Sequence, residues 1–289
     1  MIWRDLVSNG TILTDGAWGT ELQKRGLGLG ECPDAWNLSH PGDVADVAGR
    51  YCDAGSRVIL TNTFRANPIS LAAHGLAGCA AEINRAGVEI SKRAAAVALV
   101  FASIGPSGKL LPAGEVTEDE LLAAFRAQAE VLAAGGADAL LLETFSDLDE
   151  ALTAFKAARA TGLPVIVSFA FDTGKNKDRT MTGVTPERAA KAMTEAGVDA
   201  VGANCGVGIE QLVELCRRMR AATHLPLWMK PNAGMPEVVD GAVEYRVTAQ
   251  QFASSVPLLR DAGASFVGGC CGTNPEFIRA AAAALSRCA

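Results

Sequence analysis

The chain has 289 residues, of which 49% are hydrophobic and 20% are charged, and its formal net charge is −6. This balance is ordinary for a compact protein with a large core, and the absence of a Lys/Arg cluster argues against a nucleic-acid partner. The first residues lack the basic and then apolar pattern of a signal peptide. The longest apolar stretch, 94–104, is too short to span a bilayer. We therefore expect a cytoplasmic protein with no membrane partner.

Eight short runs with strand character alternate with helix-like runs along the chain. Each strand candidate is a nearly continuous apolar run, which is typical of parallel strands buried on both faces. The candidates are residues 11–17, 56–62, 98–105, 138–144, 164–171, 199–205, 226–232 and 265–272. Eight such units predict an α/β fold, a single-domain (β/α)8 TIM barrel over residues 1–289, with an open doubly wound sheet as the alternative.

Helix boundaries can be assigned between these strands. Residues 116–134 offer Thr117 as an N-cap, then acids in the first turn and apolar residues at helical spacing. Thr185-Pro186 and Asn274-Pro275 each place a capping residue before a proline that suits the first helical position. Three Ala-Gly pairs are typical of left-handed helix ends: Ala54-Gly55, Ala196-Gly197 and Ala262-Gly263.

Active sites of β/α barrels lie at the C-terminal ends of the strands. The loops after the first, second, fifth and seventh candidates are long and rich in Gly, Pro and polar residues, which is typical of loops that carry function. Polar or metal-binding side chains also end six of the strands: Asp15-Gly16, Asn62-Thr63, Glu143-Thr144, Asn204-Cys205, Lys230-Pro231-Asn232 and Cys270-Cys271. We therefore expect the active site on this face.

Three of the eight cysteines stand out by their position. Cys205 ends the sixth strand candidate, and Cys270 and Cys271 end the eighth. Both strands are even-numbered, so their inward residues can share one layer of the barrel. Neighbouring residues on a regular strand face opposite sides, so the vicinal pair reaches one metal only if the strand ends or bulges there. The flanking glycines make this easy.

Three thiolates and an open fourth position are typical of catalytic zinc, and sulfur ligands favour zinc over magnesium or calcium. The alternative is a vicinal pair that is merely small and buried. For the cysteines in helix-like or loop-like segments, burial is the simpler interpretation: Cys32, Cys52, Cys79, Cys216 and Cys288.

The histidines supply a negative observation. His40, His74 and His224 all lie away from the strand ends, which argues against a histidine base or a histidine-rich zinc site. Binding of a substrate thiol as the fourth ligand fits this residue set, because the metal lowers the pKa of the thiol. The resulting thiolate can attack an activated methyl group.

Five motifs, in order over essentially the whole chain, resemble the homocysteine S-methyltransferase family. This family includes the homocysteine-binding barrel of cobalamin-dependent methionine synthase and betaine–homocysteine methyltransferase. The motifs are Thr14-Asp15-Gly16 with Gly19-Thr20, Thr61-Asn62-Thr63-Phe64, Leu142-Glu143-Thr144, Gly202-Ala203-Asn204-Cys205 and Gly268-Gly269-Cys270-Cys271-Gly272. The resemblance implies a zinc-dependent enzyme that methylates the thiolate of homocysteine to give methionine.

The resemblance also implies roles for individual residues. The zinc ligands would be Cys205, Cys270 and Cys271. Asp15 and Glu143 would hold the homocysteine amino group, with the Gly16 backbone nearby. Asn232 resembles the residue that occupies the fourth zinc position before the substrate arrives, and Asn204 would support the cysteine loop.

The methyl donor stays open. Betaine enzymes bind the quaternary ammonium in an aromatic cage, and this chain has Cys32, Arg65 and Thr144 where those enzymes carry the aromatics. Two donors are left, a methyl-corrinoid protein supplied in trans and a small sulfonium such as S-methylmethionine. Arg65 at the rim favours the first, because it would repel a cationic donor.

Two further interpretations are open at this point. A lyase or a phosphate-handling barrel would use glycine-rich backbone after the seventh and eighth strands, where Gly269 and Gly272 lie. The vicinal cysteines argue against it. A non-catalytic homocysteine-binding subunit of a split methyltransferase would carry the same site residues as the enzyme.

Overall fold

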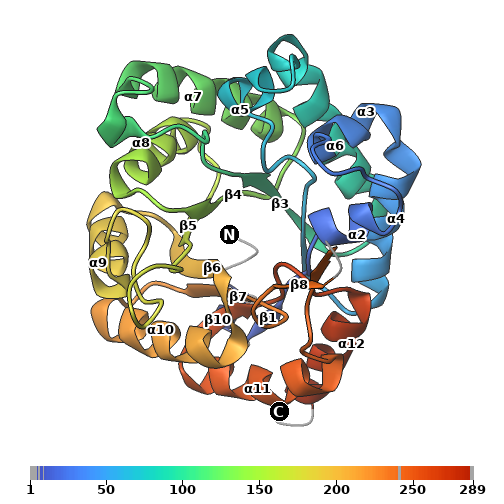
Figure 1. Cartoon of the computed structure of the whole chain (residues 1–289), viewed down its shortest axis with the longest axis vertical. Coiled ribbons are helices and arrows are strands. Elements are labelled where there is room, and N and C mark those ends of the chain that lie inside the picture. The colour runs from blue at the N-terminus through green and yellow to red at the C-terminus, as the bar shows by residue number, and fades with distance from the viewer. Residues whose placement is uncertain (1–4, 6, 9, 240–241, 287–289) are drawn as a thin grey trace.

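The computed structural model describes residues 5, 7–8, 10–239 and 242–286, and its parallel strands form a nearly closed barrel inside a ring of helices (Figure 1). Neighbouring strands follow the order β1-β10-β7-β6-β5-β4-β3-β2. A parallel bridge between Thr14 and Val58 joins the two ends of this order. The structure therefore confirms the predicted (β/α)8 barrel over the open doubly wound sheet.

Most elements lie close to the predicted ranges, but the first and last barrel strands end well before the predicted 17 and 272. The barrel strands are β1 (Ile12–Leu13), β2 (Val58–Leu60), β3 (Leu99–Ile104), β4 (Ala139–Phe145), β5 (Val165–Phe169), β6 (Ala200–Gly208), β7 (Leu227–Asn232) and β10 (Ala264–Val267). The α-helices are α2 (Gly19–Gln23), α3 (Trp36–Ser39), α4 (Pro41–Asp53), α5 (Pro68–Ala72), α6 (Ala80–Ala94), α7 (Glu118–Ala134), α8 (Leu148–Arg159), α9 (Pro186–Ala196), α10 (Ile209–Ala222), α11 (Ala249–Asp261) and α12 (Pro275–Ser286). Short 3-10 helices span Pro33–Ala35, Ala77–Cys79 and Leu111–Ala113.

The predicted helix boundaries are present. Thr117 caps α7 through a capping box with Glu120, and the side chain of Thr185 caps α9. Asn274 Oδ1 accepts a hydrogen bond from the Glu276 N–H at 2.8 Å at the start of α12. The glycines of the three predicted stops are left-handed, with φ of 104° at Gly55, 86° at Gly197 and 100° at Gly263.

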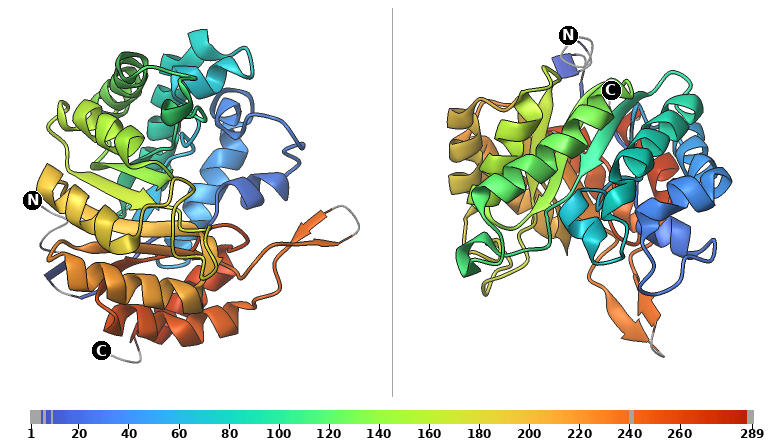
Figure 2. Two further views of the ribbon diagram at one scale, coloured as in Figure 1. Left: turned by 60° about the vertical axis from the view of Figure 1, so that its left-hand side comes forward. Right: turned by 90° about the horizontal axis from the view of Figure 1, so that it is seen from above.

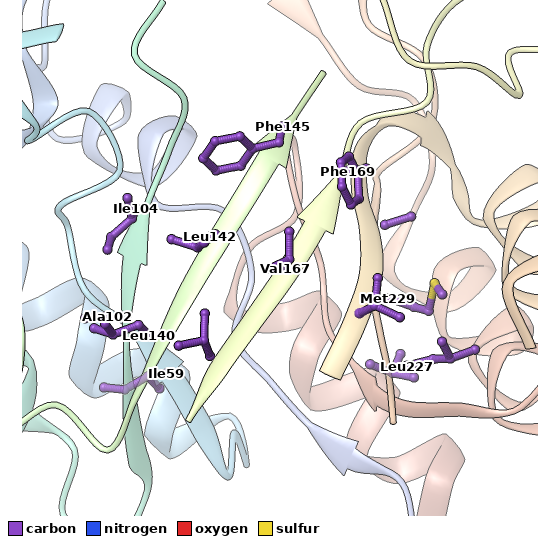
Figure 3. Close-up of a cluster of buried hydrophobic side chains, with 14 of the residues drawn as sticks. Ile59, Ala102, Ile104, Leu140, Leu142, Phe145, Val167, Phe169, Leu227 and Met229 are labelled. Atoms are coloured by element: carbon purple, nitrogen blue, oxygen red, sulfur yellow. The ribbon is translucent and has the colours of Figure 1, made fainter. Parts of the chain in front are cut away.

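Alternation along the strands sorts the buried apolar side chains into two layers. One layer packs between the barrel and the helices, and Figure 3 shows part of it: Ile59, Ala102, Ile104, Leu140, Leu142, Phe145, Val167, Phe169, Leu227 and Met229. The other layer fills the barrel itself. Phe101, Trp228 and Phe266 form its aromatic centre, with ring centroids between 5.2 and 6.1 Å apart.

The same two-residue period changes the barrel interior from apolar to polar towards its C-terminal end. Ser103 lies two residues after Phe101, and Lys230 lies two residues after Trp228. Equivalent interior positions on β4, β5 and β6 hold polar side chains, and all are buried: Glu143, Ser168 and Asn204. The strand pattern therefore places a polar layer directly above the aromatic centre, beside the strand ends.

Two features differ from the expected elements. β1 is only two residues long, because beyond the Thr14 bridge the chain turns into the site at Asp15. The long loop after β7 contains an unpredicted antiparallel hairpin, β8 (Glu237–Val239) with β9 (Ala242–Glu244), which stands out from the barrel (Figure 2). The sequence Asp240-Gly241 between two apolar runs is a hairpin signal, although these two residues lie outside the described ones.

Two further expectations from the sequence concern a membrane span and one cysteine. No helix among the described residues is long and apolar enough to cross a membrane. Cys288, which we interpret as a cysteine without a site role, lies outside the described residues.

Candidate metal centre

Three thiols from two separate stretches of the chain meet at the C-terminal face of the barrel. The sulfur atoms of Cys205, Cys270 and Cys271 all lie within 4.8 Å of one another. The Sγ atoms of Cys205 and Cys271 are 3.7 Å apart, although 66 positions separate them in sequence. The three side chains are half-buried, so they form a compact cluster that a ligand can reach.

The backbone explains how the thiols converge. Cys205 has a left-handed φ of 62° within an irregular stretch of β6, a conformation that costs a non-glycine residue free energy and marks functional sites. β10 ends at Val267, so Cys270 and Cys271 lie beyond the alternation of the strand. The Cys270 N–H donates to the Pro231 carbonyl at 2.7 Å, and the Ala233 N–H donates to the Cys271 carbonyl at 2.9 Å. These bonds tie the cysteine loop to the end of β7.

The glycines around the vicinal pair are required by packing. A Cβ atom on Gly268 would overlap the Thr14 hydroxyl and lie 2.6 Å from the Asp15 carbonyl oxygen. A Cβ atom on Gly272, whose φ is 81°, would overlap the ring of Tyr245. The glycines therefore let the cysteine loop pack directly against the loops after β1 and β9.

The three thiols disfavour one another's ionisation. The hydrogen bond with Cys270 lowers the pKa of Cys205, but its hydrogen bond with Cys271 and burial raise that pKa more, to about 12. The hydrogen bond with Cys205 lowers the pKa of Cys271, but the proximity of Cys270 and burial raise it, also to about 12. Three thiolates are stable together only beside a cation, because like charges at this spacing disfavour ionisation.

The donor set fits zinc. Tetrahedral zinc–thiolate bonds of about 2.3 Å place sulfur atoms ~3.8 Å apart, close to the 3.7 Å between Cys205 and Cys271. Asn232, at the end of β7, is buried, and its Oδ1 has no hydrogen-bond partner among the described residues. A buried amide oxygen without a donor is costly, and the residues on either side of Asn232 bond the backbone of Cys270 and Cys271, so a metal ion held by the thiols is a candidate partner for it. We call these three cysteines and Asn232 the metal end of the site.

Asn204 supports the cluster from below. Its Oδ1 accepts hydrogen bonds from the Thr144 N–H at 3.0 Å and from the Ser168 hydroxyl at 2.6 Å. Its Nδ2 donates to the Thr144 hydroxyl at 2.7 Å and lies 4.0 Å from Cys270 Sγ. Asn204, the residue directly before Cys205, therefore ties the end of β6 to β4 and β5.

A second group of charged side chains lies beneath the mouth, and we call it the acid end. Lys230 Nζ is 2.5 Å from Asp15 Oδ1, and both side chains are buried. Asp15 Oδ2 accepts hydrogen bonds from the Leu60 N–H at 2.7 Å and from the Trp18 indole N–H at 2.8 Å. Glu143 Oε1 accepts a hydrogen bond from the Ser103 hydroxyl. The acid end comprises Asp15, Glu143 and Lys230.

Charges at the acid end act on one another. Burial raises the pKa of Glu143, and the Lys230 ammonium and the Ser103 hydroxyl only partly offset this. Burial lowers the pKa of Lys230, but attraction by Asp15 and Glu143 outweighs it, so the net shift is upward. Lys230 therefore stays protonated inside the barrel. Gly16, the next residue after Asp15, is buried where a Cβ atom would meet Thr273 and Tyr51.

Sequence reasoning missed two residues of this site. Lys230 was noted only as part of a strand end, although a lysine in the apolar run Leu227–Asn232 is itself a signal. Tyr245 lies against the cysteine loop, where burial and the neighbouring Cys271 raise its pKa. No sequence signal linked Tyr245 to the cysteines, because it follows the unpredicted hairpin.

Comparison with known proteins shows which family the chain resembles along its length. The model of the homocysteine S-methyltransferase family matches residues 12–285. Methionine synthases of Mycobacterium leprae and Mycobacterium tuberculosis are 31% and 30% identical over 95% and 98% of this chain. The chain spans about a quarter of their length, 24% and 25%.

Solved structures give a full-length match. The metallated form of the homocysteine methyltransferase MmuM from Escherichia coli superposes with a TM-score of 0.81 at 26% identity, covering 97% of this chain and 98% of that one. The oxidized form of the same protein gives a TM-score of 0.79 at 26% identity. The family model covers nearly the whole chain, and the chain therefore belongs to the homocysteine S-methyltransferase family.

Proposed function

We propose that this chain transfers a methyl group to the thiolate of homocysteine to give methionine, with zinc held by Cys205, Cys270 and Cys271. The single observation that carries the proposal is the cluster of three sulfur atoms within 4.8 Å of one another at the barrel mouth. Bound zinc would lower the pKa of the acceptor thiol, so that a thiolate exists at neutral pH. The metallated form of MmuM supports a metal in this fold.

The chain's own residues would bind and orient the acceptor. Asn232 would occupy the fourth metal position until the acceptor sulfur replaces its amide oxygen, which has no other partner among the described residues. The acid end would receive the α-ammonium, since Glu143 and Asp15 lie inside the mouth and are buried. The Gly16 backbone next to Asp15 would line the same pocket. Asn204 would hold Cys205 in its left-handed conformation through the bonds to β4 and β5.

For the methyl donor we propose a methyl-corrinoid protein supplied in trans. Arg65, in the loop after β2, is exposed, and its backbone N–H donates to Asp34 Oδ1 at 3.0 Å. Its guanidinium would repel a sulfonium or a quaternary ammonium near the mouth. The likeness to methionine synthases supports a corrinoid donor as well. A small sulfonium such as S-methylmethionine is the competing donor.

A donor panel tests this proposal. Zinc-loaded protein with L-homocysteine is incubated with a methylcobalamin-loaded corrinoid protein, with S-methylmethionine or with betaine, and methionine is measured. We expect methionine with the corrinoid protein and none with betaine. Methionine from S-methylmethionine alone would contradict the donor assignment but keep the acceptor chemistry.

A zinc-loaded sample that binds homocysteine but forms no methionine with any donor would favour the non-catalytic subunit instead. Tight binding of phosphorylated ligands without binding of homocysteine would favour an unrelated barrel enzyme. The control is Cys270→Ser, which should form no methionine with any donor.

A further inference from the structure

Asp15 is almost fully occupied by other protein groups. A carboxylate has about four acceptor positions, and three groups of the chain already take three of them. These are the Lys230 ammonium at 2.5 Å, the Leu60 N–H at 2.7 Å and the Trp18 indole N–H at 2.8 Å. The side chain has no exposed surface. An incoming ammonium group could bind Asp15 only by displacing one of these partners.

Glu143, unlike Asp15, has few hydrogen-bond partners among the described residues. It points into the barrel from β4 and keeps 8% of its surface exposed. In the described part of the chain Ser103 is its only hydrogen-bond donor, and that bond uses Oε1. The next residue, Thr144, accepts a hydrogen bond from Asn204 Nδ2, which lies 4.0 Å from Cys270 Sγ. A ligand that reaches from the thiol cluster into the barrel therefore meets Glu143 as an acid with free acceptor capacity.

The charge count at the acid end points the same way. Two carboxylates and one ammonium leave one negative charge without a counter-charge if both acids are ionised. An amino acid brings one α-ammonium, and a buried carboxylate favours a partner of opposite charge over none. One positively charged group on the ligand completes the set, whereas a thiol without an amine leaves Glu143 unpaired.

We propose that Lys230 is a positioning residue that holds Asp15 and thereby makes Glu143 the single acid that selects acceptor thiols carrying an α-ammonium. This inference rests on the proposed function and concerns the choice of acceptor. Lys230 lies two residues after Trp228 on β7, so both side chains point into the barrel. The ring centroid of Trp228 lies 5.7 Å from Lys230 Nζ. The internal pair Asp15–Lys230 is thus built into the barrel, and only Glu143 is left for the ligand.

Calorimetric titration of zinc-loaded protein tests this without any methyl donor. The two ligands are L-homocysteine and 4-mercaptobutanoate, which has the same thiol and carboxylate but lacks the amine. We expect the wild-type protein to prefer homocysteine by at least ~30-fold, the effect of leaving a buried charge unpaired. Glu143→Gln should reduce the preference to less than about threefold.

The double variant Asp15→Asn with Lys230→Met separates the two acids. It removes both members of the internal pair together, which is far less disruptive than removing one, and it should keep a preference of at least about tenfold. Lys230→Met alone should lower the thermal midpoint, and adding Asp15→Asn should restore it. A purely structural role for Lys230 would not predict which acid carries the preference.

Three outcomes would overturn the inference. The first is a preference for homocysteine that survives in Glu143→Gln, and the second is a preference that disappears in the double variant. Either result would make Asp15 the acid that binds the amine. A double variant that loses affinity for both thiols equally would mean that Lys230 contacts the acceptor carboxylate. If wild-type protein binds neither thiol, the proposed function itself fails, which the other three results do not imply.

Discussion

At the metal end of the site three thiols crowd together and a buried amide oxygen has no partner among the described residues, whereas at the acid end Asp15 and Lys230 neutralise each other. Cys205 and Cys271 have sulfur atoms 3.7 Å apart and pKa values raised to about 12. Asp15 instead meets Lys230 at 2.5 Å and two further donors. The three thiols would need a bound cation to ionise together, while the acid end carries most of its own counter-charge.

This difference indicates that the metal end mainly binds ligands, whereas the acid end mainly fixes geometry. A group that is incomplete within the chain gains free energy when its ligand arrives, because the ligand removes an existing cost. A group that is already neutralised is rigid and pre-organised, so it fixes geometry. We therefore expect substitutions at the metal end to change ligand binding most, and substitutions at the acid end to change both stability and choice of acceptor.

The largest effect is expected at the metal end. Cys270→Ser should reduce zinc affinity by more than the ~100-fold that loss of a supporting residue costs, and it should abolish methionine formation. Cys79→Ser is the matched control, since Cys79 is half-buried in a 3-10 helix after α5. Zinc content and competition with a chromogenic chelator measure the effect. Equal zinc binding in the two variants would remove Cys270 from the ligand set.

The acid end should respond in stability. Lys230→Met leaves Asp15 as a buried carboxylate without its ammonium, and we expect a loss of about 3–5 kcal/mol in the free energy of unfolding. Addition of Asp15→Asn should restore most of it. Urea unfolding at pH 7.5 measures both variants and the parent. A single variant as stable as the wild type would show that the pair contributes nothing to the fold.

The cysteine loop depends on close packing, which a glycine substitution tests. Gly268→Ala would place a methyl group against Thr14 and the Asp15 carbonyl, and we expect a loss of about 1–3 kcal/mol together with weaker zinc binding. Gly49→Ala is the control, because it lies inside α4 with open space around it and should be neutral or stabilising. The prediction fails if both variants unfold at the same urea concentration as the wild type.

A buried acid without an ammonium partner should behave differently from Asp15. Burial raises the pKa of Asp34 from 3.8 to about 6, only partly offset by the hydrogen bond from the Arg65 N–H. Because the folded state holds this proton more tightly than the unfolded state, stability is greatest below pH 4 and falls as the pH rises to about 6. Asp34→Asn should therefore stabilise the protein at pH 7.5, by no more than about 3 kcal/mol, but not at pH 4.

Thermal midpoints of Asp34→Asn and the parent across this pH range check the sign. A variant that is stabilised equally at pH 4 and at pH 7.5 would mean that the effect is not electrostatic.

Much of the fold followed from the sequence because the apolar runs that define the strands are local. The positions of Cys205 and of the vicinal pair at strand ends were readable for the same reason. The Asp15–Lys230 pair was not readable, since it depends on how β7 and the loop after β1 meet once the barrel closes. The left-handed φ of 62° at Cys205 was equally hidden, because a non-glycine residue gives no local signal for it.

The proposed methyl transfer depends most on coordination of a metal by three cysteine sulfurs, with a fourth position at which the acceptor thiol would replace Asn232. X-ray absorption spectroscopy of zinc-loaded protein measures this directly. We predict three sulfur ligands at about 2.3 Å and one oxygen or nitrogen ligand at about 2.0–2.2 Å, and four sulfur ligands after L-homocysteine is added. Fewer than three sulfur ligands at rest, or an unchanged ligand set with saturating homocysteine, would contradict it.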